Sequence, residues 1–158
     1  MILLRIYKTY VLPLFDYSDV LYNGANSDLL DQLQFIQNRC IKYCLKLPML
    51  TPTDYIHQEV KLPKLVERRK YHAQIVGFKR SRIEDFVTAP VRQTRTNVAP
   101  VLNYRIIHCA AYERALEVYV SRIWNALKPE IRLTEDLKMF KILMKKELEN
   151  TIPTNIVL

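Results

Sequence analysis

Apolar residues recur at every third or fourth position over most of the chain, which is the period of an amphipathic helix. The clearest stripe lies in residues 27–47, after a turn at Gly24, and begins at Ser27, whose hydroxyl is suited to cap a helix. We therefore expect one long helix here. Its stripe consists of Leu29, Leu30, Leu33, Ile36, Cys40, Ile41, Cys44 and Leu47.

Further segments with the same period are expected to be helical. The first should end near Val11, because Pro13 would remove a backbone hydrogen bond from a longer helix. Thr51 and Pro52 suit the N-cap and first position of a short helix, and Thr134 suits the cap of the last one. The predicted helices cover residues 2–11, 51–60, 63–82, 112–127 and 134–148.

The helical period is lost over residues 81–104, where Thr, Asn and Pro are frequent. This stretch predicts a long irregular connection with room for a minor hairpin. The sequence thus predicts an all-α fold, a small bundle of about five to six helices. We expect a helical region over residues 1–80, the connection over 81–104 and a C-terminal helical region over 105–158.

Composition supports helix over sheet, because the chain has only two glycines for tight hairpin turns. The apolar start "MILLRIYKTYVLPLF" is interrupted by Arg5 and Lys8, so we expect no secretory signal. No stretch approaches the ~20 apolar residues of a membrane span, and no membrane partner is predicted. The three cysteines form no disulfide framework. An intracellular protein, nuclear or cytoplasmic and not secreted, is the expectation.

Cys40 and Cys44 allow two interpretations. They could belong to a metal site, but further ligands would have to come from His57, His72, His108 or Cys109, none of which has zinc-finger spacing. They also lie on the apolar stripe of their helix, where free cysteine behaves as a small hydrophobe. We therefore predict that both cysteines are buried and bind no metal, and that His72 is a core histidine.

The net charge of +8 and a pI near 9.4 indicate an anionic partner. Residues 61–95 carry ten bases and three acids, so most of the net charge lies there. Such a run is by default a solvated surface, but it can also contact phosphates and make binding dependent on salt. We favour phosphate contact, and the candidate nucleic-acid-binding residues are Lys64, Arg68, Lys79, Arg80, Arg82, Arg92 and Arg95.

Two further motifs lie in the blocks "IYKTYVLPLFDYSDVLYNGANSDLLDQLQFIQNRCIKYCLKL" and "RIWNALKPEIRLTEDLKMFKILMKKEL". Together they resemble the thumb and post-polymerase region of reverse transcriptases from jockey-like non-LTR retrotransposons. The chain departs from that family at its Leu-Tyr-Asn-Gly turn, where the family has Trp, and at the added Lys128. The matching positions are Tyr7, Lys8, Thr9, Val11, Pro13, Tyr17, Leu33, Ile36, Gln37, Arg39, Trp124, Asn125, Leu127, Pro129, Ile131, Leu137, Phe140 and Lys141.

The resemblance implies that the chain corresponds to part of a polymerase without its catalytic palm. In that family the palm carries the metal-binding carboxylates in an aromatic-x-Asp-Asp turn, and no such turn occurs in this sequence. The nearest carboxylate pairs are Asp16 with Asp19 and Glu84 with Asp85, which we interpret as solvated or capping groups. We expect no catalysis, no cofactor and no metal. The expected partner is an RNA–DNA hybrid or duplex held by its backbone, and a separate polymerase chain is a second expected partner.

A different class of function stays open, a helical scaffold derived from such an element that binds proteins through Trp124 and the last two helices. An intact small enzyme is disfavoured, because the sequence has no Gly-rich phosphate loop and no Ser-His-Asp set. The residues predicted to be structural are Cys40, Cys44, Trp124, Leu137 and Phe140.

Overall fold

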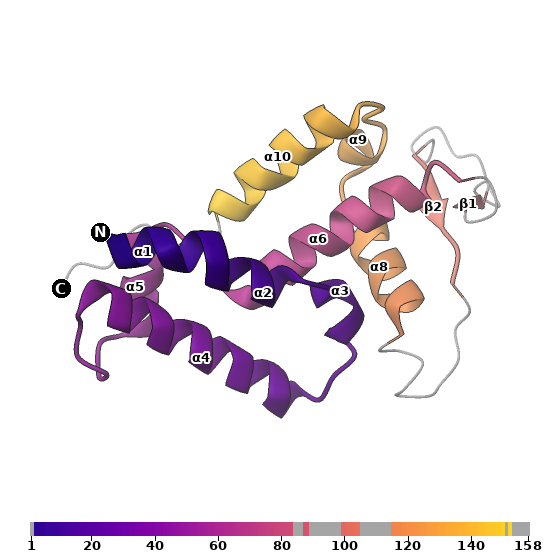
Figure 1. The fold of residues 1–158 in the computed structure, drawn as a ribbon. Coiled ribbons are helices and arrows are strands. Elements are labelled where there is room, and N and C mark those ends of the chain that lie inside the picture. Colours follow the sequence, from indigo (N-terminus) through magenta and orange to yellow (C-terminus); the bar gives the residue numbers. More distant parts are fainter. Residues whose placement is uncertain (1, 84–86, 89–98, 105–114, 151, 153–158) are drawn as a thin grey trace. The chain divides into compact units, whose positions relative to one another are not determined.

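The computed structural model describes residues 2–83, 87–88, 99–104, 115–150 and 152 (Figure 1). Over these residues the fold is all-α, as predicted, with six helices of at least seven residues when α1, η1 and α2 are counted as one. The chain divides into two compact units. Unit 1 comprises residues 1–69 and 147–158, and unit 2 comprises residues 70–146. The predicted division at residues 80 and 104 stays a prediction.

Helices account for most of the described residues of both units. Unit 1 contains α1 (Ile2–Ile6), the π-helical turn η1 (Tyr7–Val11), α2 (Leu12–Asp16), α3 (Asp19–Tyr22), α4 (Ser27–Leu45), α5 (Thr53–Val60) and the start of α6 (Leu65–Arg80). Unit 2 contains the rest of α6, β1 (Val87–Thr88), β2 (Val101–Leu102), α8 (Leu116–Asn125), α9 (Pro129–Arg132) and most of α10 (Leu137–Asn150).

The first helix does not stop before Pro13, contrary to the prediction. It continues as α1, η1 and α2 to Asp16, with Pro13 in the first turn of α2. A proline is tolerated there because the regular hydrogen-bond pattern of the α-helix is already interrupted just before it, so its missing N–H leaves no bond of that pattern unmade. The π-helical turn supplies that interruption, since Leu12 N–H donates to the carbonyl of Tyr7, five residues earlier.

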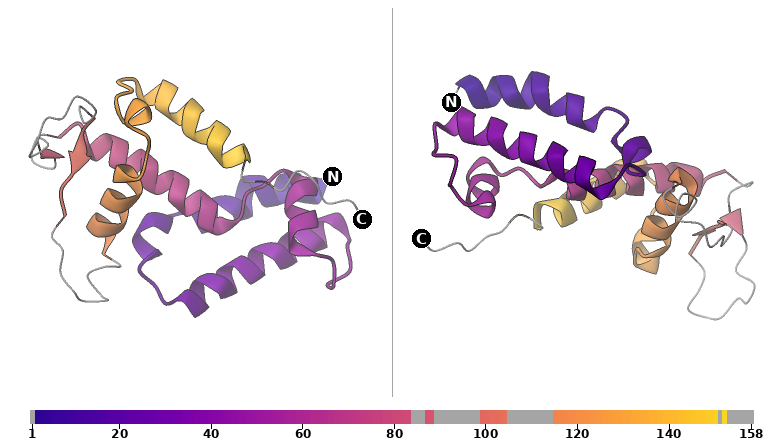
Figure 2. Two further views of the ribbon diagram at one scale, coloured as in Figure 1. Left: turned by 180° about the vertical axis from the view of Figure 1, so that it is seen from behind. Right: turned by 90° about the horizontal axis from the view of Figure 1, so that it is seen from below.

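The core of unit 1 lies between the α1–η1–α2 helix, α4 and α5, and the first two lie side by side in the right-hand view of Figure 2. Its buried members are Tyr7, Leu12, Ile41, Ile56, Val60 and Leu62. Cys40 and Cys44 pack against this cluster as free thiols but are only half-buried, so the prediction of full burial is wrong. The stripe of α4 is wider than its contact with the core, which leaves Leu29 and Ile36 exposed.

The caps of three helices lie one or two residues away from the predicted positions. Asn26, not Ser27, precedes α4, and its side chain accepts a hydrogen bond from the N–H of Asp28. Asp136, not Thr134, caps α10 by accepting from the N–H of Lys138 at 2.9 Å. Pro52, not Thr51, precedes α5. In each case two or more capping residues are adjacent, and the sequence alone does not select between them.

Three aromatic side chains form the core of unit 2. Trp124 of α8 is fully buried, its ring centroid 5.8 Å from that of Phe140 on α10 and 6.3 Å from that of Phe78 on α6. Phe78 and Phe140 are themselves 4.7 Å apart. The Trp124 indole N–H donates to the carbonyl of Pro100 at 3.0 Å, so its one polar group is satisfied in the core. These contacts hold α6, α8 and α10 together.

The predicted minor hairpin is a two-residue antiparallel pairing. Val87 pairs with Leu102, and Thr88 with Val101. The side chain of Asn125 binds both backbone groups of Leu102, accepting from its N–H and donating to its carbonyl, each at 3.0 Å. Asn125 therefore makes the backbone hydrogen bonds that a further strand would make at this edge of β2, and it connects β2 to α8.

Gly77 of α6 faces Trp124, so a larger side chain does not fit there. A Cβ at Gly77 would lie 3.0 Å from the Cβ of Trp124. We expect Gly77→Leu to lower the free energy of unfolding by roughly 1–3 kcal/mol, although leucine is the better helix former. Urea unfolding followed by circular dichroism measures this change. The control Lys79→Leu, at an exposed position of the same helix, should change stability by less than ~0.5 kcal/mol.

Candidate nucleic-acid interface

The whole net charge of the chain belongs to unit 2. Unit 2 contains fifteen Lys and Arg against seven Asp and Glu, whereas unit 1 contains nine of each. The basic run seen in the sequence over residues 61–95 is therefore divided, because the boundary between the units falls after Arg69. An anionic partner that responds to net charge would be attracted to unit 2.

Helix α10 presents a basic face. Lys138, Lys141 and Lys145 follow one another at three- and four-residue steps, so they project from one side of the helix, and all three are exposed. Phe140 and Met144 are the residues that α10 buries in the core. No acidic side chain pairs with these three lysines among the residues that the structure describes. Their charges are thus available to a ligand.

Three predicted site residues lie at the C-terminal end of α6, in unit 2. Lys79 is exposed, and Arg80 approaches Glu117 at 3.9 Å. Arg82 stacks over the Phe78 ring at 4.9 Å and donates to the carbonyl of Thr134, just before α10. Arg82 therefore joins the basic end of α6 to the segment that leads into the basic face of α10. The predicted residues Arg92 and Arg95 lie outside the described residues.

The two remaining candidates belong to unit 1 and are paired within it. Lys64 lies 2.9 Å from Asp54 in a largely exposed ion pair. Arg68, predicted to contact phosphates, instead binds both carboxylate oxygens of Asp16, with its Nε donating at 2.8 Å. The Arg68 side chain is only 18% exposed; this burial opposes its charge, but the bonds to Asp16 hold its pKa above the usual range. Arg68 is therefore occupied and we do not include it among the phosphate contacts.

The same geometry corrects the interpretation of Asp16 as a solvated or capping group. Asp19, with 3% of its surface exposed, is not solvated either, but it lies in the first turn of α3, which is the position of a capping group. Asp16 is half-buried against Arg68. A carboxylate can be buried when a guanidinium offers it two parallel hydrogen bonds, and the separation of 52 residues keeps this partner from being visible in the sequence. Val66, an apolar residue of the helix predicted over residues 63–82, is 51% exposed.

Reversal of the charge at Arg68 should destabilise unit 1. In Arg68→Glu, two carboxylates would face each other in a partly buried position, and we expect a loss of roughly 1–3 kcal/mol in the free energy of unfolding. The double exchange Asp16→Arg with Arg68→Glu should recover part of this loss. Urea unfolding of the three proteins checks the prediction, and equal stability of wild type and Arg68→Glu would contradict it.

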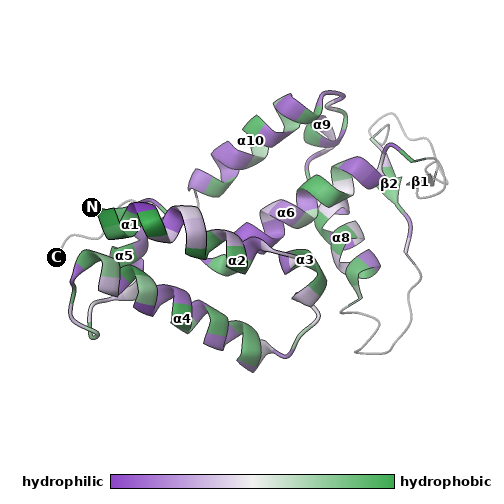
Figure 3. Cartoon of the chain, viewed as in Figure 1, coloured by the Kyte–Doolittle hydropathy of each residue, from purple (hydrophilic) through white to green (hydrophobic). Residues whose placement is uncertain are grey.

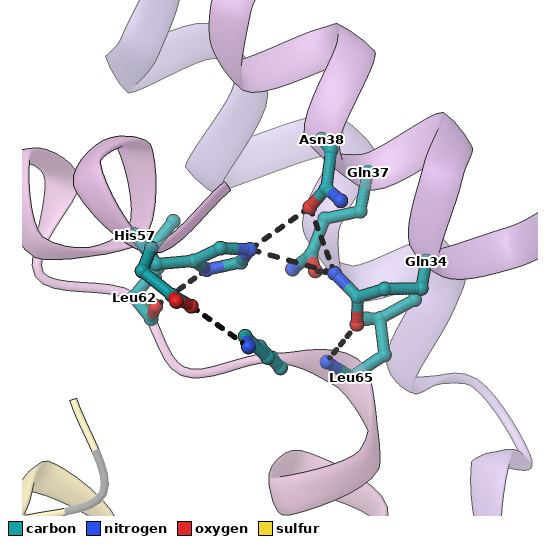
Figure 4. A network of polar contacts seen from close by, with 8 residues as sticks. Gln34, Gln37, Asn38, His57, Leu62 and Leu65 are labelled. Atoms are coloured by element: carbon teal, nitrogen blue, oxygen red, sulfur yellow. Dashed lines mark hydrogen bonds and ion pairs between the residues drawn. The ribbon is translucent and has the colours of Figure 1, made fainter. Parts of the chain in front are cut away.

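A partly buried network of polar side chains joins α4 and α5 to the start of α6 (Figure 4). The His57 ring lies 2.8 Å from the Leu62 carbonyl through Nδ1 and 2.9 Å from Asn38 Oδ1 through Nε2. Gln34 donates to Asn38 at 2.9 Å and accepts from the N–H of Leu65 at 2.8 Å. The sequence analysis named His57 only as a candidate metal ligand and assigned a core position to His72 instead; the signal for the burial of His57 was its position on the apolar face of a short helix.

Protonation of His57 should oppose folding. Burial lowers its pKa below the ordinary value of 6.5, although the hydrogen bond to the Leu62 carbonyl and the charge of Asp54 act in the other direction. In the neutral ring Nδ1–H can donate to the Leu62 carbonyl and Nε2 can accept from Gln34 Nε2, 3.4 Å away. Burial favours this neutral form in the folded protein, so its contribution to stability is complete above pH ~6.5 and is lost as the pH falls below that value. Asp54 does not titrate in this window, since its hydrogen bond from Lys64 lowers its pKa below 3.8.

We expect the free energy of unfolding of the wild type to fall between pH 7.5 and 5, by at most ~1.4 kcal/mol per pH unit. His57→Gln should reduce this slope while it keeps polar groups in the network. The measurement is urea unfolding at several pH values. Parallel pH profiles for the two proteins would show that His57 is not the titrating group.

In comparisons with known proteins, no protein-family model, no curated protein and no solved structure matches the chain. Among the described residues, the helices are too short or too polar to cross a membrane. Function is therefore inferred from the geometry and charge of the residues described above.

Proposed function

We propose that the chain binds nucleic acid through unit 2, without dependence on sequence, and that it is a non-catalytic C-terminal part of a retrotransposon-type RNA-directed DNA polymerase. The observation that carries the binding proposal is that the entire net charge of +8 lies in this one compact unit. The resemblance of two blocks of the sequence to such polymerases supports the proposed origin. Each phosphate that a lysine or arginine neutralises releases counterions and adds to affinity.

The arrangement favours contact with the backbone over contact with bases. Lys138, Lys141 and Lys145 are flexible point charges on an exposed helix face, suited to phosphate oxygens. Sequence recognition depends on side chains held against base edges in a groove. None of the three lysines is fixed by a partner among the described residues. A duplex or an RNA–DNA hybrid would thus be held regardless of its sequence.

The geometry of Asp16 supports the non-catalytic part of the proposal. Two-metal catalysis needs carboxylates that are free to bind Mg²⁺. Asp16 is bound by Arg68 through both of its oxygens, so its charge is already neutralised. Primer extension on a homopolymer template that is lost in Asp16→Ala would contradict this part.

The binding proposal is tested by fluorescence anisotropy with labelled RNA–DNA hybrid and duplex DNA of two unrelated sequences. We expect a Kd in the micromolar range or weaker at low salt, equal for the two sequences. For four or five phosphate contacts, affinity should fall by about two orders of magnitude between ~50 and ~200 mM salt. No binding at the lowest salt, or a strong preference for one sequence, would overturn the proposal.

A protein-binding scaffold is the second candidate. Its predicted interface through Trp124 is not supported, because Trp124 is fully buried in the core of unit 2. Unit 1 offers a different surface, where many large apolar side chains are exposed, among them Ile2, Tyr10, Leu14 and Tyr43. Exposed apolar side chains of this kind favour a protein partner in unit 1 over a nucleic acid.

A further inference from the structure

A groove of about 800 Å³ runs between the α1–η1 helix and α4 in unit 1. Its walls are mostly apolar: Leu3, Ile6 and Val11 on one side, Ile36, Tyr43 and Leu47 on the other. Tyr7 and the half-buried Cys40 also line it. Figure 3 shows the hydrophobic positions along both helices. The groove therefore exposes apolar surface that a partner could cover.

The apolar side chains of the groove are too exposed to be explained by packing within unit 1. Tyr43 is 77% exposed, Met49 53% and Ile36 47%, although all three line a groove beside the buried core cluster of unit 1. Scattered exposed apolar residues are ordinary, but here they line one continuous depression. Burial of this surface by a partner would contribute free energy in proportion to its area.

The charge around the groove selects the kind of partner. The charged residues that line it are Arg39, Lys42 and Lys46, and none of the acidic residues that the structure describes lines it. This imbalance is local, because unit 1 as a whole has equal numbers of acids and bases. Arg39 and Lys46 are exposed, so their charges can reach a ligand that lies in the groove. A partner with acidic residues along its edges complements this rim.

The walls of the groove also select the conformation of the partner. Both are helices, whose backbone groups are already hydrogen-bonded, so the groove offers no strand edge for an extended peptide to pair with. An occupant must satisfy its own backbone groups, as a helix does. The α4 wall extends about 15 Å, enough for some three helical turns.

We propose that this groove binds an amphipathic helix of another protein, one whose apolar stripe fills the groove and whose flanks carry Asp and Glu. The proposal is independent of nucleic-acid binding, which we assign to unit 2. Helix-in-groove recognition of this kind uses apolar anchors at three- and four-residue steps.

The test uses two designed peptides of about five helical turns with the same leucine stripe, one flanked by Glu and the other by Lys. The protein is the full chain with Cys109→Ser, so that Cys40 and Cys44 are its remaining cysteines. Affinity is measured by fluorescence anisotropy. Because unit 2 is basic and could attract any acidic peptide, the site is located by protection of Cys40 from alkylation. Cys40 and Cys44 both line the groove, so alkylation at each of the two positions is measured separately by mass spectrometry of the digested protein.

We expect the Glu-flanked peptide to bind about tenfold more tightly than the Lys-flanked one and to protect Cys40. Arg39→Glu with Lys46→Glu should invert the preference between the peptides. Ile36→Glu should abolish the protection, whereas Leu21→Glu, a control at an exposed apolar position outside the groove, should leave it unchanged.

Three results would overturn the proposal: neither peptide protects Cys40, the rim variant keeps the wild-type preference, or Ile36→Glu binds as tightly as wild type. Analytical ultracentrifugation of the protein without peptide tests whether the groove binds a second copy of the chain. If the chain dimerises and Ile36→Glu makes it monomeric, the occupant is a second copy of this chain and not an acidic helix. A failure to bind duplex or hybrid would leave all of these outcomes unaffected.

Discussion

Replacement of Lys138, Lys141 and Lys145 together by glutamate is expected to lower affinity for duplex and hybrid by one to two orders of magnitude at low salt. The three lysines form the exposed basic face of α10, and the change removes their charges from up to three phosphates and adds repulsion. The slope of log affinity against log salt should become shallower by about 0.9 for each phosphate that is no longer neutralised, about three in total. Anisotropy across a salt series measures both quantities.

A matched control separates the position of the charges from their number. Arg5→Glu, Lys46→Glu and Lys61→Glu change the net charge by the same amount, at three exposed positions of unit 1. If unit 2 holds the nucleic acid, this control should bind far more tightly than the α10 variant. Equal losses of affinity in the two variants would show that binding follows overall charge and that α10 is not the site.

Phe140→Ala is expected to lower the free energy of unfolding of unit 2 by about 3–5 kcal/mol, a large part of the stability of a small domain. Phe140 is fully buried between Trp124 and Phe78, so its removal leaves a cavity between three helices. The control Met139→Ala, next to it on α10 but 52% exposed, should change stability by less than ~0.5 kcal/mol.

The chain contains one tryptophan, and it lies in this core, so its fluorescence reports on unit 2. Circular dichroism reports on the helices of both units. If the two units unfold separately, the fluorescence transition of Phe140→Ala should shift to lower urea while part of the circular dichroism signal does not. An unchanged fluorescence midpoint would contradict the assignment of Phe140 to the core.

The long helices could be predicted from the sequence because a period of 3.6 residues is a property of each segment by itself. The helix predicted over residues 27–47 is α4, and Phe140 of the predicted last stripe is fully buried. The helical period does not determine how deeply each apolar side chain is buried. Cys40 and Ile36 share a stripe with the fully buried Ile41, but the neighbouring helix covers only part of that stripe.

The candidate site was less predictable, because charge in a sequence is read along the chain and binding depends on charge in space. The run over residues 61–95 drew attention to Lys64 and Arg68, which fold into the neutral unit 1 and pair with Asp54 and Asp16. The spacing of Lys138, Lys141 and Lys145, with no acid between them, was a usable signal in the sequence that a count of charge over long windows does not reveal.

The π-helical turn η1 fixes the rotational phase of the first helix. In an α-helix each residue advances the side-chain direction by about 100°. A π-helical turn accommodates an extra residue, so removal of Thr9, an exposed member of η1, would restore regular α-helix. It would also turn α1 by about that angle relative to α2, and Leu3 and Ile6 would leave the groove while Leu12 stayed in the core. The number of residues in this segment, and not only their identity, is therefore part of what builds the groove.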